Sequence, residues 1–250
     1  GSVLDEPAIR SSEDAFVDRL FSDAPAQGAP LLAAELPRAY LDLNRSADEL
    51  DPALIEGVAR GPHNPRVASG LGVVPRVVAN GRAIYRGKIP RAEAAHRIDH
   101  VWTPYHNTLR RLIERAHDRF GEAILIDCHS MPHEAVTNVA RGGRRAEVVI
   151  GDRFGASAGS SVVDAIEAAF VAAGFAVARN APFAGAYTVQ HYGRPSRGRH
   201  AVQVEIDRAL YMDERTVRPN AGFDAFRATL GGVVAELAAL GRREIPLAAE

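Results

Sequence analysis

The segment "ILIDCHSMP", residues 124–132, passes directly from large apolar side chains to an acid and an imidazole. A short apolar run of this kind predicts a buried strand, and no Gly or Asn follows it to make an ordinary turn. Side chains alternate along a strand, so we expect Asp127 and His129 on one face and Cys128 on the other. The sequence therefore predicts two ionisable side chains together at the end of a core strand.

Helical and strand patterns alternate on both sides of this segment, which predicts an α/β fold. We expect one domain over residues 1–250, with a mostly parallel mixed sheet and helices on both faces. A long excursion at residues 51–88 contains a hairpin signal at Asn80-Gly81. The predicted helices cover residues 11–24, 91–120 with an interruption at Pro104, 161–173 and 223–240, and further strands cover 31–34, 40–43, 175–180 and 201–210.

Four predicted strands end in polar residues. The segments are "DLNR" (42–45), "DCHS" (127–130), "RN" (179–180) and "EIDR" (205–208). Ligands of parallel α/β sheets bind beyond the carboxyl ends of the strands, so we expect these four ends to meet at one rim.

Composition excludes several classes of function. A net charge of −1 is unlike a nucleic-acid-binding surface, which needs a basic stripe. No apolar run approaches the ~20 residues of a membrane span, and no secretory leader is recognisable. Cys128 is the single cysteine and has no partner for an internal disulfide, which indicates a reducing compartment. We expect a cytoplasmic protein that binds a small molecule, and its oligomeric state stays open.

The chemistry at the predicted rim centres on His129. Imidazole and carboxylate are zinc ligands, and Asp127 could accept the second N–H of a liganding imidazole. An ordinary core histidine is an equal alternative from spacing alone. Ser130 lacks the G-x-S-x-G context of a serine hydrolase, and Cys128 is better explained as a small buried residue.

Other polar residues are candidates for binding or acid–base chemistry. Asn44 and Arg45 could bind a carboxylate, although a surface arginine capping a turn is the commoner use of such a pair. Glu205 lies in an otherwise apolar strand, where a carboxylate must be paired, metal-bound or shifted in pKa. His191, in the aromatic stretch "AYTVQHYGRP", is a candidate pocket residue, whereas the loop context of His63 favours solvent.

A set of short motifs resembles the N-formylglutamate amidohydrolase (deformylase) family over about residues 4–240. The motifs occur in the family's order: "SEDAFVDRLF", "PRAYLDLNR", "ELDP", "GVVPRV", "PYH", "LIDCHSMP", "GDRFG", "RNAPFAGAYTVQHYGRP" and "QVEIDRALYMDE". The resemblance implies a zinc-dependent enzyme, related in fold to carboxypeptidase- and aspartoacylase-like hydrolases. It also implies removal of formate from N-formyl-L-glutamate.

The resemblance also implies a metal site. His129 would be a zinc ligand and Asp14 the carboxylate ligand, with the adjacent Glu13 as the alternative. The family carries a further histidine ligand in a Ser-Pro-His-Ser-Gly-like segment expected before Leu4. This chain begins "GSVLDEP", without that histidine.

Substrate and catalytic roles follow from the same resemblance. Glu205 would be the general base that takes a proton from a zinc-activated water and passes it to the leaving amine. The residues that would hold the acidic substrate or line its pocket are Arg38, Asn44, Arg45, Tyr187 and His191. Two alternative functions remain open: a metal-dependent peptidase or deacylase of other specificity, and a binding protein that has lost the metal.

Overall fold

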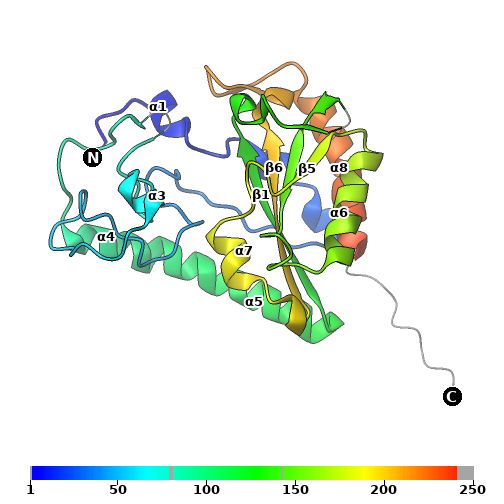
Figure 1. Ribbon diagram of the computed structural model, residues 1–250, viewed down its shortest axis with the longest axis horizontal. Coiled ribbons are helices and arrows are strands. Elements are labelled where there is room, and N and C mark those ends of the chain that lie inside the picture. The colour runs from blue at the N-terminus through cyan, green and yellow to red at the C-terminus, as the bar shows by residue number, and fades with distance from the viewer. Residues whose placement is uncertain (1, 79–80, 142, 241–250) are drawn as a thin grey trace.

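The computed structural model describes residues 2–78, 81–141 and 143–240, and its centre is a four-stranded sheet (Figure 1). The strands are β1 (Ala123–Met131), β4 (Val148–Gly151), β5 (Val177–Arg179) and β6 (Arg199–Asp207), in the order β1-β6-β4-β5. β1 is parallel to β6 and β4 is parallel to β5, whereas β4 and β6 are antiparallel. The predicted mixed, mostly parallel sheet is therefore confirmed.

The remaining elements are helices and two small strand pairs. The helices are α1 (Glu6–Arg10), α2 (Val17–Leu20), η1 (Ala24–Gln27), α3 (Pro65–Ala68), α4 (Arg91–Arg97), η3 (Ile98–Trp102), α5 (Thr103–Phe120), η4 (His133–Val136), α6 (Ser160–Ala172), α7 (Tyr187–Tyr192), η5 (Pro195–Arg197), η6 (Arg208–Leu210) and α8 (Phe223–Leu240). The pairs are β2 (Ala140–Arg141) with β3 (Arg144–Arg145), and β7 (Met212–Asp213) with β8 (Arg218–Pro219).

Helices cover both faces of the sheet, as the sequence predicted. Ile124 and Ile126 of β1 pack into the cluster that contains α6 and α8, while Leu125 packs with Leu109 and Ile113 of α5. Alternation along the strand sends these two sets of side chains to opposite faces. Figure 1 shows α6 and α8 together on one side of the sheet and α5 with α7 on the other.

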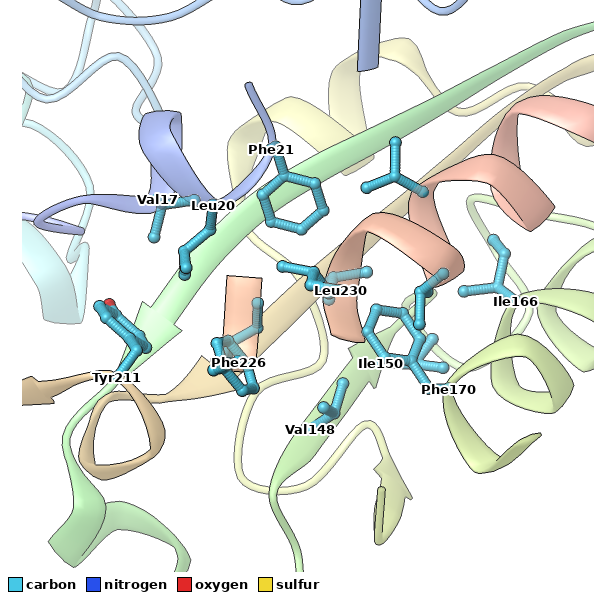
Figure 2. Packing of buried hydrophobic residues seen from close by; sticks show 14 of the residues in the cluster. Val17, Leu20, Phe21, Val148, Ile150, Ile166, Phe170, Tyr211, Phe226 and Leu230 are labelled. Atoms are coloured by element: carbon cyan, nitrogen blue, oxygen red, sulfur yellow. The ribbon is translucent and has the colours of Figure 1, made fainter. Parts of the chain in front are cut away.

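The main core also holds the short helix α2. Leu20 and Phe21 pack among the fully buried Phe170 of α6 and Leu230 of α8 (Figure 2). Burying side chains of this size contributes roughly 1.5–3 kcal/mol each. This packing anchors the segment that precedes α2, which contains Asp14.

Two sequence predictions for the first 50 residues are wrong. The helix predicted over residues 11–24 is broken, because Phe16 has a φ of 67° and only Val17–Leu20 is α-helical. The strands predicted at 31–34 and 40–43 are irregular backbone. Pro37 starts a turn in which its carbonyl accepts from the N–H of Tyr40, and the N–H of Asp42 bonds to the carbonyl of Val73. The backbone N–H groups of Tyr40 and Asp42 therefore make turn and loop hydrogen bonds and not the bonds of a strand pair.

The long helical pattern at residues 91–120 is confirmed, but its interruption differs from the prediction. α4 continues through the π-helical turn η3 into α5, and Pro104 lies in the first turn of α5. The hairpin predicted near Gly81 is supported by the antiparallel bridge between Val77 and Ala83, while Asn80 lies outside the described residues.

The four polar strand ends do not all meet at one rim. β5 runs antiparallel to β1, because the β4–β6 pairing reverses direction within the sheet. Asn180 therefore bonds to Asp152 after β4 and does not reach His129.

Among the described residues, no helix is long and apolar enough to cross a membrane.

Candidate active site

The register of β1 against β6 assembles four polar side chains on one face of the sheet. Asp127 is paired with Gln203, and His129 with Glu205. The intervening Cys128 packs into the core on the other face, where burial raises the pKa of its thiol. The predicted division of this strand into a polar and an apolar face is confirmed.

Asp14 reaches the end of β1 from the segment before α2. Its Oδ2 lies 2.9 Å from Nδ1 of His129 and 3.2 Å from Nη1 of Arg38. Its Oδ1 accepts hydrogen bonds from the backbone N–H and the hydroxyl of Ser130. Burial opposes the charge of Asp14, but Arg38 and His129 outweigh it and hold the pKa of this carboxyl well below its usual range.

The structure distinguishes between the two candidate acids near α2. Glu13 forms an ion pair with Arg10 at 3.0 Å, whereas Asp14 contacts His129. Ser130 donates its hydroxyl to Asp14 and accepts from Nε of Arg208. This hydroxyl therefore supports Asp14, and its bonds are not those of an activated nucleophile.

His129 lies between two carboxylates. Its Nε2 is 3.1 Å from Oδ2 of Asp127, opposite the Nδ1 contact with Asp14. Burial disfavours the imidazolium, but Asp127 and Asp14 outweigh that effect and raise the pKa of His129 well above its usual value. The ring is therefore held in a fixed orientation by an acid on each side.

Asn44 connects the irregular loop after Pro37 to the sheet. Its Nδ2 lies 3.0 Å from Nε2 of His129 and 3.4 Å from Oδ2 of Asp127, and its Oδ1 accepts from the backbone N–H of Thr188. Nε2 of Gln203 in turn donates to Oε1 of Glu205 at 2.8 Å. The polar groups of β1, β6 and this loop thus form one buried network.

Glu205 is positioned to exchange protons near neutral pH. Burial raises its pKa to about 7, and the negative charge of Asp14 acts in the same direction, while His129 and Arg38 oppose it. General acid–base catalysis is most effective when the pKa of the group lies near the working pH. Glu205 is therefore a suitable acid–base group at this site.

Two of the predicted arginines lie beside this network. Arg38 bridges Asp14 and Asp42, with Nε 3.3 Å from Oδ2 of Asp42. Arg45 donates to the backbone carbonyls of Leu71 and Asn44, and its shortest ion-pair distance, to Asp42, is 3.8 Å. Arg38 is thus already neutralised by carboxylates, whereas Arg45 retains capacity to bind an anion.

Two hollows meet at this network. One, of about 740 Å³, runs along β1 and is lined by Asp14, Asp127 and His129. The other, of about 620 Å³, is lined by Arg45 and Glu205 and is called the Glu205 cavity below. Asn44 lines both hollows, which have the volumes of small-molecule sites.

Tyr187 and His191 lie apart from the lining of both hollows. Their rings stack at 5.0 Å on α7, and Tyr187 also packs against Trp102 and His106. His191 is exposed to solvent. Their part in binding substrate stays a prediction.

His106 and Trp102 are site-supporting residues that sequence patterns missed. Nε2 of His106 lies 2.9 Å from the carbonyl of Leu43, and Nε1 of Trp102 donates to the carbonyl of Arg45. These contacts fix the backbone on either side of Asn44. The motif "PYH" contains His106, but its role depends on a loop more than 60 positions away in sequence, which no local pattern reveals.

The donor groups present meet part of the requirements of a zinc site. Nδ1 of His129 and Oδ2 of Asp14 face each other, and Asp127 can accept the remaining N–H of the imidazole, which is the usual support for a liganding histidine. Among residues 2–78, 81–141 and 143–240, no group of three or more His, Cys, Asp or Glu side chains is arranged to hold a metal ion. Two donors of the expected kind are therefore together, and a catalytic zinc normally has three.

Comparisons with known proteins identify the family of this chain. Residues 1–212 match the family described as N-formylglutamate amidohydrolase. This chain belongs to the N-formylglutamate amidohydrolase family. It is 32% identical to the N-formylglutamate deformylase of Pseudomonas aeruginosa, with 96% of this chain and 86% of that protein aligned. It is 30% identical to the N-formylglutamate deformylase of Pseudomonas putida, over 85% of this chain and 75% of that protein.

A solved structure gives the same family, and a second one shares the fold. The N-formylglutamate amidohydrolase of Ralstonia eutropha superposes with a TM-score of 0.89 at 36% identity, covering 97% of this chain and 88% of that one. The Atu2144 product of Agrobacterium tumefaciens has a TM-score of 0.57 at 18% identity, covering 92% of this chain and 77% of that one. The second likeness concerns the fold alone.

The buried His106 leads to a prediction about this family member's stability. Burial lowers its pKa to about 4, so the ring is neutral in the folded protein at pH 7. Replacing it with Ala leaves the carbonyl of Leu43 without its donor, and we expect a loss of about 1–3 kcal/mol in the free energy of unfolding. The variant His106→Gln, whose amide can replace Nε2–H, should recover part of that loss in denaturant titrations.

The pH dependence of stability provides the control. An unfolded histidine binds its proton near pH 6.5, whereas folded His106 binds it only near pH 4. At position 106 the unfolded state therefore binds more protons between these values, so the stability that His106 contributes is lost as the pH falls from 6.5 to 4. Glu205, whose pKa is raised to about 7, acts in the opposite direction, so the effect of His106 is measured as the difference between the wild-type protein and His106→Gln. His106→Gln lacks this contribution. An unchanged slope in that variant would show that His106 is not buried as a neutral ring.

Proposed function

We propose that this chain hydrolyses the formyl amide of N-formyl-L-glutamate to formate and L-glutamate. The names of its relatives support the reaction class, and their alignment covers most of each protein. The observation that carries the assignment is the pairing of His129 with Glu205 across β1 and β6, beside a cavity that also contains Arg45. An acid–base carboxylate next to an imidazole–carboxylate pair and an anion-binding arginine suits cleavage of an acidic N-acyl amino acid.

The proposal includes one zinc ion, with His129 and Asp14 as ligands. Their donor atoms already face each other, and Asp127 would keep the second nitrogen of His129 protonated. A third donor has to join this pair. When bound, zinc supplies Lewis-acid activation of a water molecule and of the formyl carbonyl.

The remaining steps belong to the protein's own side chains. Glu205 accepts a proton from the attacking water and delivers it to the nitrogen of the leaving amine, so that the C–N bond breaks as formate and glutamate separate. Arg45 binds a carboxylate of the substrate, and Asn44 is placed to orient the reacting group against His129. Gln203, which donates to Glu205, holds that carboxylate toward the site.

The metal proposal predicts the effect of removing His129. Purified wild-type protein loaded with zinc should hold about one ion per chain. His129→Ala should hold almost none, because the loss of this ligand leaves the site with too few donors to retain zinc. Metal content is measured by mass spectrometry after dialysis. The exposed His96 provides the control, since His96→Ala should keep the wild-type zinc content. Zinc retained at the wild-type level in His129→Ala would remove this residue from the ligand set.

A second prediction concerns Arg45. Truncating one partner of a buried charge pair costs about 2–5 kcal/mol of binding. Arg45→Ala should therefore raise the KM for N-formyl-L-glutamate far more than the KM for a neutral formyl amide. The exposed Arg60, which lies in the excursion at residues 51–88, gives a control variant for loss of a positive charge. Equal effects of Arg45→Ala on both substrates would assign this arginine to the loop structure alone.

Formate release tests the reaction itself, with Glu205→Gln as the decisive variant. The change keeps the shape of the side chain and removes the base, so turnover should fall by roughly 10²–10⁴ while KM and zinc content stay nearly constant. Wild-type protein that holds zinc and releases no formate from N-formyl-L-glutamate would contradict the proposed function. A Gln variant that turns over within a few-fold of wild type would contradict the role of Glu205, and loss of zinc would make Glu205 a ligand.

A further inference from the structure

The loop after β4 holds two consecutive non-glycine residues in the left-handed region. Arg153 has a φ of 54° and Phe154 a φ of 56°. Residues other than Gly, Asn and Asp rarely adopt this conformation, and such outliers concentrate at functional sites. A glycine would adopt the backbone conformation of position 153 more easily, so the presence of an arginine there indicates a role for its side chain.

The loop is held in this conformation by a set of directed hydrogen bonds. Oδ1 of Asn180 accepts from the backbone N–H groups of Asp152 and Phe154, and Nδ2 of Asn180 donates to Oδ1 of Asp152. The backbone N–H of Arg153 donates to the carbonyl of Ala184 at 2.8 Å. The position of Arg153 is therefore fixed from both sides.

Two glycines allow this close approach of the loop to residues 184–185. A Cβ on Gly151 would lie 2.7 Å from the carbonyl carbon of Ala184. Gly185 has a φ of 106°, and a Cβ there would lie 2.4 Å from Cγ2 of Val189. The segment can therefore pack against the loop and form the wall of the Glu205 cavity to which Arg153 belongs.

The guanidinium of Arg153 has no carboxylate partner within ion-pair distance among the described residues. Its single hydrogen bond there is from Nη1 to the carbonyl of Gly185 at 3.3 Å. Arg38, in the same cavity wall, differs because Asp14 and Asp42 neutralise it. The Glu205 cavity is also lined by Arg45 and Arg66. Arg66 is exposed to solvent, whereas Arg45 and Arg153 are partly buried, come from separate parts of the chain and can each accept an anion.

We propose that Arg153 is a specificity-determining residue that binds the side-chain carboxylate of the substrate, while Arg45 binds the α-carboxylate. This inference rests on the proposed function. The substrate carries two carboxylates, and the partly buried guanidinium groups of Arg45 and Arg153 can bind one each. A planar guanidinium suits a carboxylate because it can donate two parallel hydrogen bonds.

The assignment of each carboxylate follows from the surroundings of the two arginines. Arg45 directly follows Asn44, whose amide contacts His129 at the centre of the polar network. The α-carboxylate is attached to the carbon that bears the formamide, so it must lie near that centre. Arg153 has no contact with the network and belongs to the wall formed with Gly185. It therefore suits the carboxylate at the far end of the substrate.

The test compares two ligands that differ in the distal group alone, N-formyl-L-glutamate and N-formyl-L-glutamine. Arg153→Gly removes the side chain and favours the native backbone at this φ, so the variant should fold. Its kcat/KM for N-formyl-L-glutamate should fall about 10–100-fold, the range for losing a hydrogen bond to a charged group, mainly through KM. Its kcat/KM for N-formyl-L-glutamine should be nearly unchanged.

Three further variants make the test specific. Arg153→Lys keeps the charge and should recover part of the discrimination between the two ligands. Arg45→Ala should weaken the binding of both ligands to a similar extent, because both carry the α-carboxylate. Arg115→Ala, at an exposed position on α5, controls for loss of a positive charge and should leave kcat/KM for both ligands unchanged. Equal losses on both ligands, or no loss on either, in Arg153→Gly would overturn the proposal.

Binding measured by calorimetry separates this inference from the proposed reaction. If zinc-loaded wild-type protein releases no formate, the proposed function fails, but the preference for N-formyl-L-glutamate over N-formyl-L-glutamine can still be measured as a ratio of dissociation constants. A wild-type preference that disappears in Arg153→Gly supports the role of Arg153. A preference that persists in the variant, or wild-type protein that binds neither ligand, refutes it.

Discussion

The contact between the Asp14 carboxylate and His129 is the interaction on which the organisation of the site depends. Burying a carboxylate is costly unless its charge is compensated and its oxygens are hydrogen-bonded. Here one oxygen accepts two bonds from Ser130, and the other faces His129 and Arg38. This single group therefore joins the start of the chain, the irregular loop and the end of β1. Removing it would leave His129 with Asp127 as its remaining carboxylate partner, and Arg38 with Asp42.

The same strand serves the core and the site through alternation. Cys128 and Val204 face α6 and α8, while His129 and its register partner Glu205 face the opposite side. A slip of one residue between β1 and β6 would exchange these faces, placing carboxylates in the core and apolar side chains in the cavity. The packing of large apolar residues such as Phe170 against this sheet thus also fixes the register that pairs His129 with Glu205.

The parts of the structure that the sequence predicted are those that local patterns determine. β1, α6 and α8 are long periodic or apolar segments, and the apolar surroundings of Glu205 already indicated an unusual carboxylate. The failures come from contacts between distant segments. The direction of β5 depends on an antiparallel pairing that no local signal encodes, and Phe16 ends a helical pattern through a left-handed turn. Residues 40–43 have strand-like composition, but Pro37 places them in a turn.

Irregular backbone around the site obtains its hydrogen bonds from side chains of the long helix. Buried carbonyls need partners, and a loop without strand neighbours must find them elsewhere. Arg97 donates to the carbonyl of Tyr40, His106 bonds to that of Leu43, and Trp102 donates to that of Arg45. These three residues follow one another along α4, η3 and α5, so one rigid element sets the position of the whole loop. Asn44 and Arg45 are therefore placed as accurately as residues on a strand, although their own segment has no regular structure.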